Sequence, residues 1–199
     1  MAGIREQKKQ QTRQAIQSAA VRLFSAKGFD ATSMEEIAAE AGIGKATIYG
    51  YFPAKKEIFQ HYCDERMSAA FARFREDRDL PLALVDQLVR FFMFKFSYVT
   101  ENREFGRHLL REMIFPKETS EQSGQHDQRY FAILAEVFDS AVEKGEISPC
   151  NDRFLLAAHF FSLYLGLFAG WYNGYFSSLA DVEENMRLLF LQALEGVKK

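Results

Sequence analysis

The chain has 199 residues, of which 48% are hydrophobic, and its formal net charge is −2. This length allows one large or two small domains, and the apolar fraction excludes general disorder. The charge is unevenly divided: residues 1–60 carry nine basic and six acidic side chains (net +3), and residues 61–199 carry sixteen and twenty-one (net −5). The basic N-terminal region favours an anionic partner such as DNA, although charge alone is also compatible with an ordinary solvated face.

Three helices are predicted in the first 50 residues. The first covers residues 12–27, where apolar side chains recur at helical spacing, and Gly28 ends it. Ser33 and Glu36 have the spacing of a capping box, which begins a second helix, and Gly42 supplies the turn after it. A short third helix covers residues 45–49 and leaves small and hydroxylated side chains exposed. This is a helix-turn-helix pattern, and its third helix suits a DNA major groove.

This segment resembles the N-terminal domain of the TetR family of bacterial transcriptional regulators. The resemblance is dense over residues 10–60 and rests on Leu23-Phe24, Gly28-Phe29, Ala31-Thr32-Ser33, Glu36-Ile37-Ala38, Ala41-Gly42, Lys45, Thr47-Ile48-Tyr49, Tyr51-Phe52-Pro53 and Lys55. Gly44 and Gly50 depart from the common pattern, which often has a capping hydroxyl at the first position and a larger, DNA-contacting residue at the second.

The resemblance implies DNA contacts at Thr32, Ser33, Lys45, Ala46, Thr47, Tyr49, Tyr51 and Lys55. It assigns base contacts to Ala46 and Thr47, a guanine or phosphate contact to Lys45, and phosphate contacts to the other five. The resemblance also implies backbone or minor-groove contacts from basic residues of the N-terminal tail: Arg5, Lys8, Lys9 and Arg13.

The rest of the chain is predicted to be all helical. A long helix begins at Pro53 and ends in the charged run 75–79, and the domain boundary lies within its start, which gives a DNA-binding domain (1–55) and a helical ligand-binding and dimerisation domain (56–199). Further helices are predicted over residues 82–100, 104–114, 127–144, 153–173 and 182–196, with a polar loop over 117–125 and caps at Asp152 and Asp181. The fold class is therefore all-α, with about nine helices.

Phenylalanine is unusually frequent, at 20 of 199 residues. These rings form a large aromatic core and a dimer surface, or some of them line a pocket for an apolar or aromatic effector. The candidate pocket residues are Phe92, Phe96, His108, Arg111, Phe131, Phe161, Tyr164 and Phe168. For His108, a solvated or core histidine is the competing interpretation.

The last two helices are the predicted dimer surface. Gly166 and Gly170 form G-x-x-x-G, which permits close helix approach within a subunit or between two subunits. The apolar stripe of the last helix, beginning at Val182, is explained equally well as ordinary core. The resemblance favours a homodimer, since the last two helices of TetR-family proteins commonly form a four-helix bundle with their counterparts.

No catalytic, cofactor or metal motif stands out. The four histidines are scattered, and Cys63 and Cys150 have no paired spacing, which fits a reducing cytoplasm. Residues 154–172 are nearly long enough to span a membrane, but His159 in their middle favours a buried helix.

The sequence therefore predicts a non-enzymatic, ligand-responsive transcriptional regulator. We expect a repressor that binds a palindromic DNA operator as a dimer and is released by a small effector. An α-helical enzyme or small-molecule carrier that uses the aromatic bundle is the alternative, and a DNA-binding protein without effector control is a third possibility.

Overall fold

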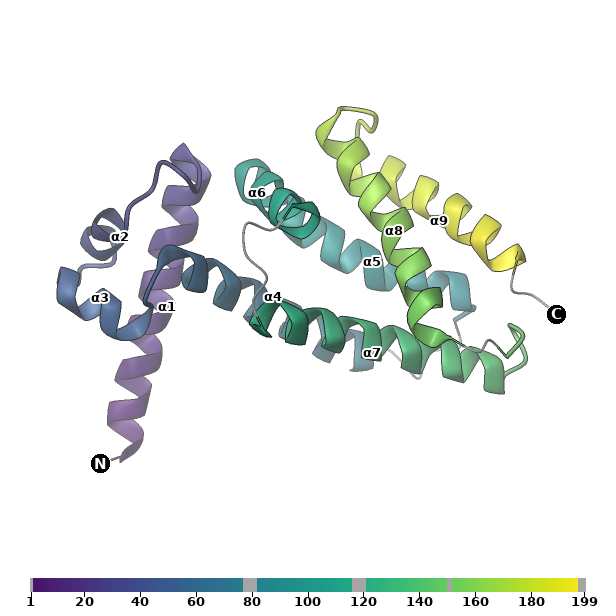
Figure 1. Cartoon of the computed structure of the whole chain (residues 1–199), viewed down its shortest axis with the longest axis horizontal. Coiled ribbons are helices and arrows are strands. Elements are labelled where there is room, and N and C mark those ends of the chain that lie inside the picture. Colours follow the sequence, from purple (N-terminus) through teal and green to yellow (C-terminus); the bar gives the residue numbers. More distant parts are fainter. Residues whose placement is uncertain (1, 77–81, 116–120, 150–151, 197–199) are drawn as a thin grey trace. The chain divides into compact units, whose positions relative to one another are not determined.

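The structure, a computed structural model, describes residues 2–76, 82–115, 121–149 and 152–196. These ranges contain nine helices and no strand, so the predicted all-α class is confirmed (Figure 1). The helices are α1 (Ala2–Lys27), α2 (Met34–Glu40), α3 (Lys45–Tyr51), α4 (Lys55–Glu76), α5 (Leu84–Thr100), α6 (Arg103–Ile114), α7 (Glu121–Glu143), α8 (Arg153–Tyr172) and α9 (Leu179–Glu195).

Two glycines end helices in the N-terminal region, as predicted. Gly28 follows α1 with φ +87°, and Gly42 follows α2 with φ +68°, a backbone region that strains any residue with a Cβ. The predicted capping box is also present at the start of α2: the Ser33 hydroxyl accepts from the Glu36 amide, and the Ser33 amide donates to the Glu36 carboxylate.

Contacts divide the chain into two compact units. The first comprises Met1–Phe71 and Val99–Leu109, and the second comprises Ala72–Tyr98 and Leu110–Lys199. Most of α4 and more than half of α6 thus belong with the N-terminal helices. The assignment of DNA binding to residues 1–55 and of ligand binding and dimerisation to residues 56–199 remains a prediction.

The first unit has a small apolar core between α1, α2, α3, α4 and α6. α2 packs against α1 and α3, and the buried side chains include Ile16, Ile37 and Ile48. Phe59 of α4 extends this core, with its ring 4.7 Å from that of Phe105 on α6. This packing places α3 at the surface with one side buried.

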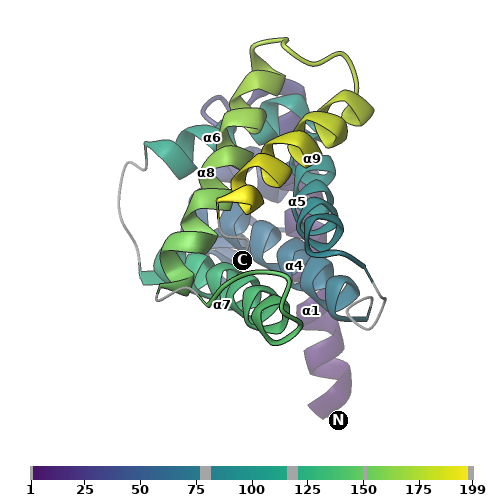
Figure 2. The ribbon, with the colours of Figure 1, turned by 90° about the vertical axis from the view of Figure 1, so that its right-hand side faces the viewer.

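The second unit is built around α5. The ring of Phe92 on α5 lies 5.9 Å from Tyr130 on α7, 5.3 Å from Tyr164 on α8 and 5.2 Å from Phe190 on α9. α8 lies beside α9, as Figure 2 shows, and also packs against α7. The phenylalanine-rich segments therefore form much of one core.

Several predicted boundaries differ from the structure. α1 begins at Ala2, not at residue 12, so the basic residues of the expected tail are helical. Residues 121–125 of the expected polar loop form the first turns of α7, and residues 117–120 lie outside the described ranges. α9 begins at Leu179 after its N-cap Ser178, and Asp181 is the third residue of that capping box and not the cap. Asp152 caps α8 as predicted.

α8 is the one helix of the described ranges that is long and apolar enough to cross a membrane. Phe160, Tyr164 and Phe168 on this helix are nonetheless completely buried against other helices of the second unit. Its place in this core accounts for the apolar side chains on its buried face.

Candidate nucleic-acid interface

The helix α3 presents a short polar face to solvent. Ile48 is completely buried and holds α3 on the first unit, whereas Lys45, Ala46, Thr47 and Tyr49 are exposed. Gly44 is the N-cap and supplies no side-chain hydrogen bond. Small side chains beside a lysine and a tyrosine allow the helix backbone to come close to base edges while the longer side chains reach out.

An ion pair joins α3 to α2. The Lys45 ammonium lies 2.6 Å from a carboxylate oxygen of Glu35, and both side chains are largely exposed. The hydrogen bond from Lys45 lowers the pKa of Glu35, and the same bond raises the pKa of Lys45. A predicted DNA contact is thus held by a neighbouring carboxylate in the free protein.

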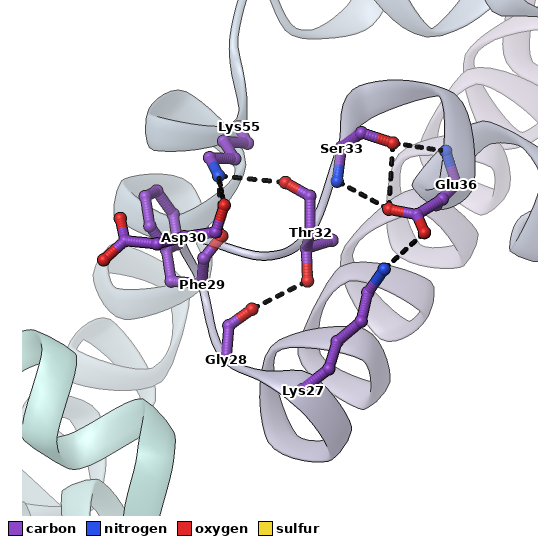
Figure 3. A network of polar contacts seen from close by, with 8 residues as sticks. All are labelled: Lys27, Gly28, Phe29, Asp30, Thr32, Ser33, Glu36 and Lys55. Atoms are coloured by element: carbon purple, nitrogen blue, oxygen red, sulfur yellow. Dashed lines mark hydrogen bonds and ion pairs between the residues drawn. The ribbon is translucent and has the colours of Figure 1, made fainter.

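The loop between α1 and α2 and the start of α2 form a polar network (Figure 3). Glu36 accepts bonds from the amide and hydroxyl of Ser33 at 2.8 and 2.9 Å and pairs with Lys27. The hydrogen bond from Lys27, followed by those from Ser33, lowers the pKa of Glu36 to about 2. Ser33, a predicted phosphate contact, therefore caps α2 in the free protein.

Two other predicted phosphate contacts, Thr32 and Lys55, have partners within the protein. Thr32 is 2% exposed, and its hydroxyl donates to the Gly28 carbonyl at 2.8 Å. Lys55 is half-buried, and its ammonium donates to the carbonyls of Phe29, Asp30 and Thr32. The family resemblance singled out Thr32 and Lys55, but nothing in the sequence indicated that both bond to carbonyl groups of the same loop.

The remaining predicted DNA contacts lie at different levels of exposure. Tyr51 is half-buried at the end of α3. Arg5, Lys8 and Lys9 are exposed on the first turns of α1. Arg13 is half-buried, with its guanidinium 5.4 Å from the centre of the Phe52 ring.

Most of the predicted pocket residues gather in one aromatic cluster of the second unit. The Tyr164 ring contacts those of Phe92, Phe96, Phe161 and Phe168, and Phe161 in turn contacts Phe131. We call these six residues the bundle cluster. All are buried or half-buried.

The two polar residues predicted for that pocket have different surroundings. His108 is buried in the first unit, where its ring stacks on Phe29 at 3.9 Å and meets Phe59 edge-on at 4.7 Å. Arg111 is exposed, and its guanidinium lies 3.9 Å from the Glu112 carboxylate.

Lys95 lies against the bundle cluster, and the sequence argument did not name it. It is 7% exposed, and its ammonium lies 4.2 Å from the ring centre of Tyr130, 4.9 Å from that of Phe161 and 5.4 Å from that of Tyr164. A single lysine inside the aromatic run 91–98 was the available signal. Among the described residues, no three His, Cys, Asp or Glu side chains are grouped as metal ligands would be.

Comparisons with known proteins agree with the helix-turn-helix reading. Residues 16–62 match the family model described as bacterial regulatory proteins, tetR family. The chain is 31% identical to the HTH-type transcriptional regulator UidR of Escherichia coli strain K12, over 70% of this chain and 71% of UidR. It is 34% identical to the HTH-type transcriptional regulator RutR of the same strain, over 72% of this chain and 68% of RutR.

A solved structure shares the whole fold. The regulator FadR of Bacillus subtilis, solved in complex with stearoyl-CoA, superposes with a TM-score of 0.74 at 20% identity, over 92% of this chain and 98% of FadR. The relatives are regulators and not enzymes. With the helix-turn-helix match and these two identities, the chain belongs to the TetR family of DNA-binding transcriptional regulators.

Proposed function

We propose that this regulator is a repressor that binds a palindromic operator as a homodimer and leaves it when a small apolar effector binds the second unit. The observation that carries the proposal is the exposed face of α3. Ile48 is buried and holds the helix on the first unit. The exposed residues around it are Lys45, Ala46, Thr47 and Tyr49. Such a face fits a major groove. A regulator of this kind acts in the cytoplasm, where the DNA is.

Each exposed residue of α3 has a distinct role in the proposed complex. Ala46 and Thr47 come close to base edges, where a methyl group meets a thymine methyl or the hydroxyl bonds a base. Lys45 exchanges Glu35 for a guanine or a phosphate, and Tyr49 and Tyr51 donate to phosphates. Thr32 and Ser33 in the loop before α2, and Lys55 at the start of α4, support these contacts through the bonds described above. The exposed Arg5, Lys8 and Lys9 on α1 add contacts to the DNA backbone.

Dimerisation through α8 and α9 has support from their exposed surfaces. Leu155 on α8 is 64% exposed, and Leu188 and Leu191 on α9 are 54% and 36% exposed. Gly166 is exposed too, and a Cβ there would meet nothing within 4 Å. Apolar side chains beside a small residue suit two helices of a second copy. Two copies would then place their α3 helices in successive major grooves, about 34–36 Å apart.

The bundle cluster is the proposed effector site. It offers an apolar surface beside the Lys95 ammonium, and the completely buried Tyr164 hydroxyl has no hydrogen-bond partner within the described part of the chain. A buried hydroxyl of this kind favours a bound polar atom. An effector with an apolar body and an acceptor group matches both features, and the stearoyl-CoA complex of FadR supports an acyl or similarly apolar compound.

Release follows if the effector binds a DNA-incompetent conformation more tightly than the DNA-bound one. α4 and α6 each contribute residues to both units, so a shift of either helix reaches both. We assign the signal to these helices.

Selection of DNA by the full-length protein from a randomised duplex library tests the first half of the proposal. We expect an inverted repeat, protected as two half-sites on one face of the DNA. A selected sequence without twofold symmetry would refute the palindromic dimer.

Native mass spectrometry of the protein as purified tests the second half by identifying small molecules retained in it. Adding the retained compound to the complex with the selected duplex is expected to release the DNA, and a reporter placed behind that duplex is expected to rise. A fall of the reporter on release would indicate an activator.

A further inference from the structure

One lysine ammonium gathers three carbonyl groups of the loop between α1 and α2. Lys55 Nζ lies 2.6 Å from the Phe29 carbonyl oxygen, 2.9 Å from that of Thr32 and 3.2 Å from that of Asp30. It also lies 4.5 Å from the centre of the Phe29 ring. An ammonium has three N–H donors and no acceptor, so three carbonyls use its whole donor capacity (Figure 3).

These bonds matter because the loop turns sharply at this point. Gly28 has a positive φ. Of the five successive carbonyls from Gly28 to Thr32, four accept a hydrogen bond from Lys55 or from the Thr32 hydroxyl, and the exception is that of Ala31. Carbonyl oxygens that point toward one another repel, and a single cation between them removes that repulsion. The shape of the loop therefore depends on Lys55.

The loop is connected to α3 through α2. The Thr32 carbonyl precedes Ser33, which is the N-cap of α2. α2 packs against α3, and its Glu35 holds Lys45. Lys55 thus fixes one end of a chain of contacts whose other end is the exposed face of α3.

We propose that Lys55 is a positioning residue for DNA binding: it fastens the Gly28–Ser33 loop to the start of α4 and thereby sets α2 and α3, without itself binding a phosphate. This rests on the proposed use of α3 as the reading helix. The family pattern by itself assigns Lys55 to the phosphate backbone, and the two roles predict different behaviour in the protein before any DNA is present.

Hydrogen exchange of the full-length, DNA-free protein separates the two roles. Lys55→Met removes all three donors at similar side-chain length, and Lys56→Met, at the next position of the same helix, removes an equal charge. We expect the Thr32 and Ser33 amides to exchange about tenfold faster or more in Lys55→Met, and at the wild-type rate in Lys56→Met. Unchanged exchange in Lys55→Met would overturn the proposal.

Lys55→Arg gives the same test at constant charge and serves if Lys55→Met does not fold. A guanidinium spreads its donors over a planar fork and cannot direct three N–H groups from one nitrogen at three carbonyls. We therefore expect Lys55→Arg to loosen the loop and weaken DNA binding. An arginine that kept wild-type exchange and wild-type affinity would overturn the positioning role, since arginine binds phosphate at least as well as lysine.

Salt dependence on the duplex selected by the wild-type protein completes the experiment. We expect Lys55→Met to bind more weakly than Lys56→Met with the same slope of log affinity against log salt. A slope lower by about one unit in Lys55→Met alone would place Lys55 on a phosphate and refute the inference. If the wild-type protein selected no duplex, the proposed function would fail, while the exchange result would still decide whether Lys55 holds the loop.

Discussion

The Lys45 ammonium of the reading helix lies 2.6 Å from the Glu35 carboxylate of the preceding helix. The ion pair gives Lys45 an anionic partner in the free protein. In the proposed complex, DNA competes with Glu35 for this lysine. Both side chains are exposed, so the competition is modest and depends on salt.

We expect Glu35→Gln to bind the selected duplex more tightly, by about two- to fivefold at low salt, because Lys45 is released and a negative charge is removed. Glu40→Gln is the matched control, since Glu40 is also on α2 and pairs with Arg22 of α1 at 3.0 Å. Fluorescence anisotropy titrations of both variants measure the effect. Weaker binding by Glu35→Gln would mean that the ion pair orients Lys45 for DNA.

Thr47→Val should change which DNA sequence is preferred. The substitution keeps the shape of an exposed side chain on α3 and removes its hydroxyl. Discrimination at one base pair of each half-site should change by about 1 kcal/mol, while binding to unrelated DNA stays the same. Competition among single-base operator variants measures this. Thr12→Val, which removes a hydroxyl that donates to the Lys8 carbonyl on α1, should leave the preference unchanged.

Gly166→Glu should convert the proposed dimer to a monomer, because Gly166 is exposed on the proposed face of α8 and close helix approach requires a small residue there. Sedimentation velocity is the measurement, and Ala132→Glu on the exposed side of α7 is the control. A dimeric Gly166→Glu protein would place the interface elsewhere.

Gly170, four residues later, is unsuitable for that test. A Cβ at this position would lie 2.7 Å from a ring carbon of Phe176, so a substitution disturbs packing inside the subunit. The two glycines of the G-x-x-x-G pattern thus have different surroundings, and a joint substitution would not separate dimer loss from unfolding.

The stability of the first unit should fall in acid through Glu36. The pKa of this carboxyl is lowered from 4.5 to about 2 by Lys27 and Ser33. A lowered pKa means that the stabilisation is complete above about pH 4.5 and disappears as the pH falls toward about 2. Glu36→Gln should lose this part of the pH dependence, as followed by thermal unfolding between these pH values. An equal pH dependence in Glu36→Gln and wild type would show that other carboxyls cause it.

Phe190→Ala should destabilise the second unit by about 3–5 kcal/mol, because the ring is completely buried between Phe92 and Phe160. Phe190→Leu, which retains more of the volume, should cost less. Urea unfolding at one fixed protein concentration is required, since the proposed dimerisation would make the apparent stability depend on concentration. A loss below about 1 kcal/mol for Phe190→Ala would indicate that the core collapses around the space.

Local signals in the sequence determined the start of α2, the turns at Gly28 and Gly42 and the cap at Asp152, because each depends on a few adjacent residues. They also determined the exposed face of α3, since its one buried residue, Ile48, lies between small and polar neighbours. Boundaries without such signals were wrong. The first turns of α1 and of α7 are polar, and their sequence predicts a tail and a loop in place of the observed helix.

Tertiary structure alone decided the partners of Lys55, Lys45 and Lys95. Lys55 bonds carbonyls more than twenty residues earlier in the chain, and Lys95 is buried among rings from α7 and α8. His108, which the sequence predicts as a pocket residue, stacks on Phe29, about eighty residues earlier in the chain. A sequence shows which side chains can donate, accept or stack, but the burial and distance that select one partner arise only when remote helices pack together.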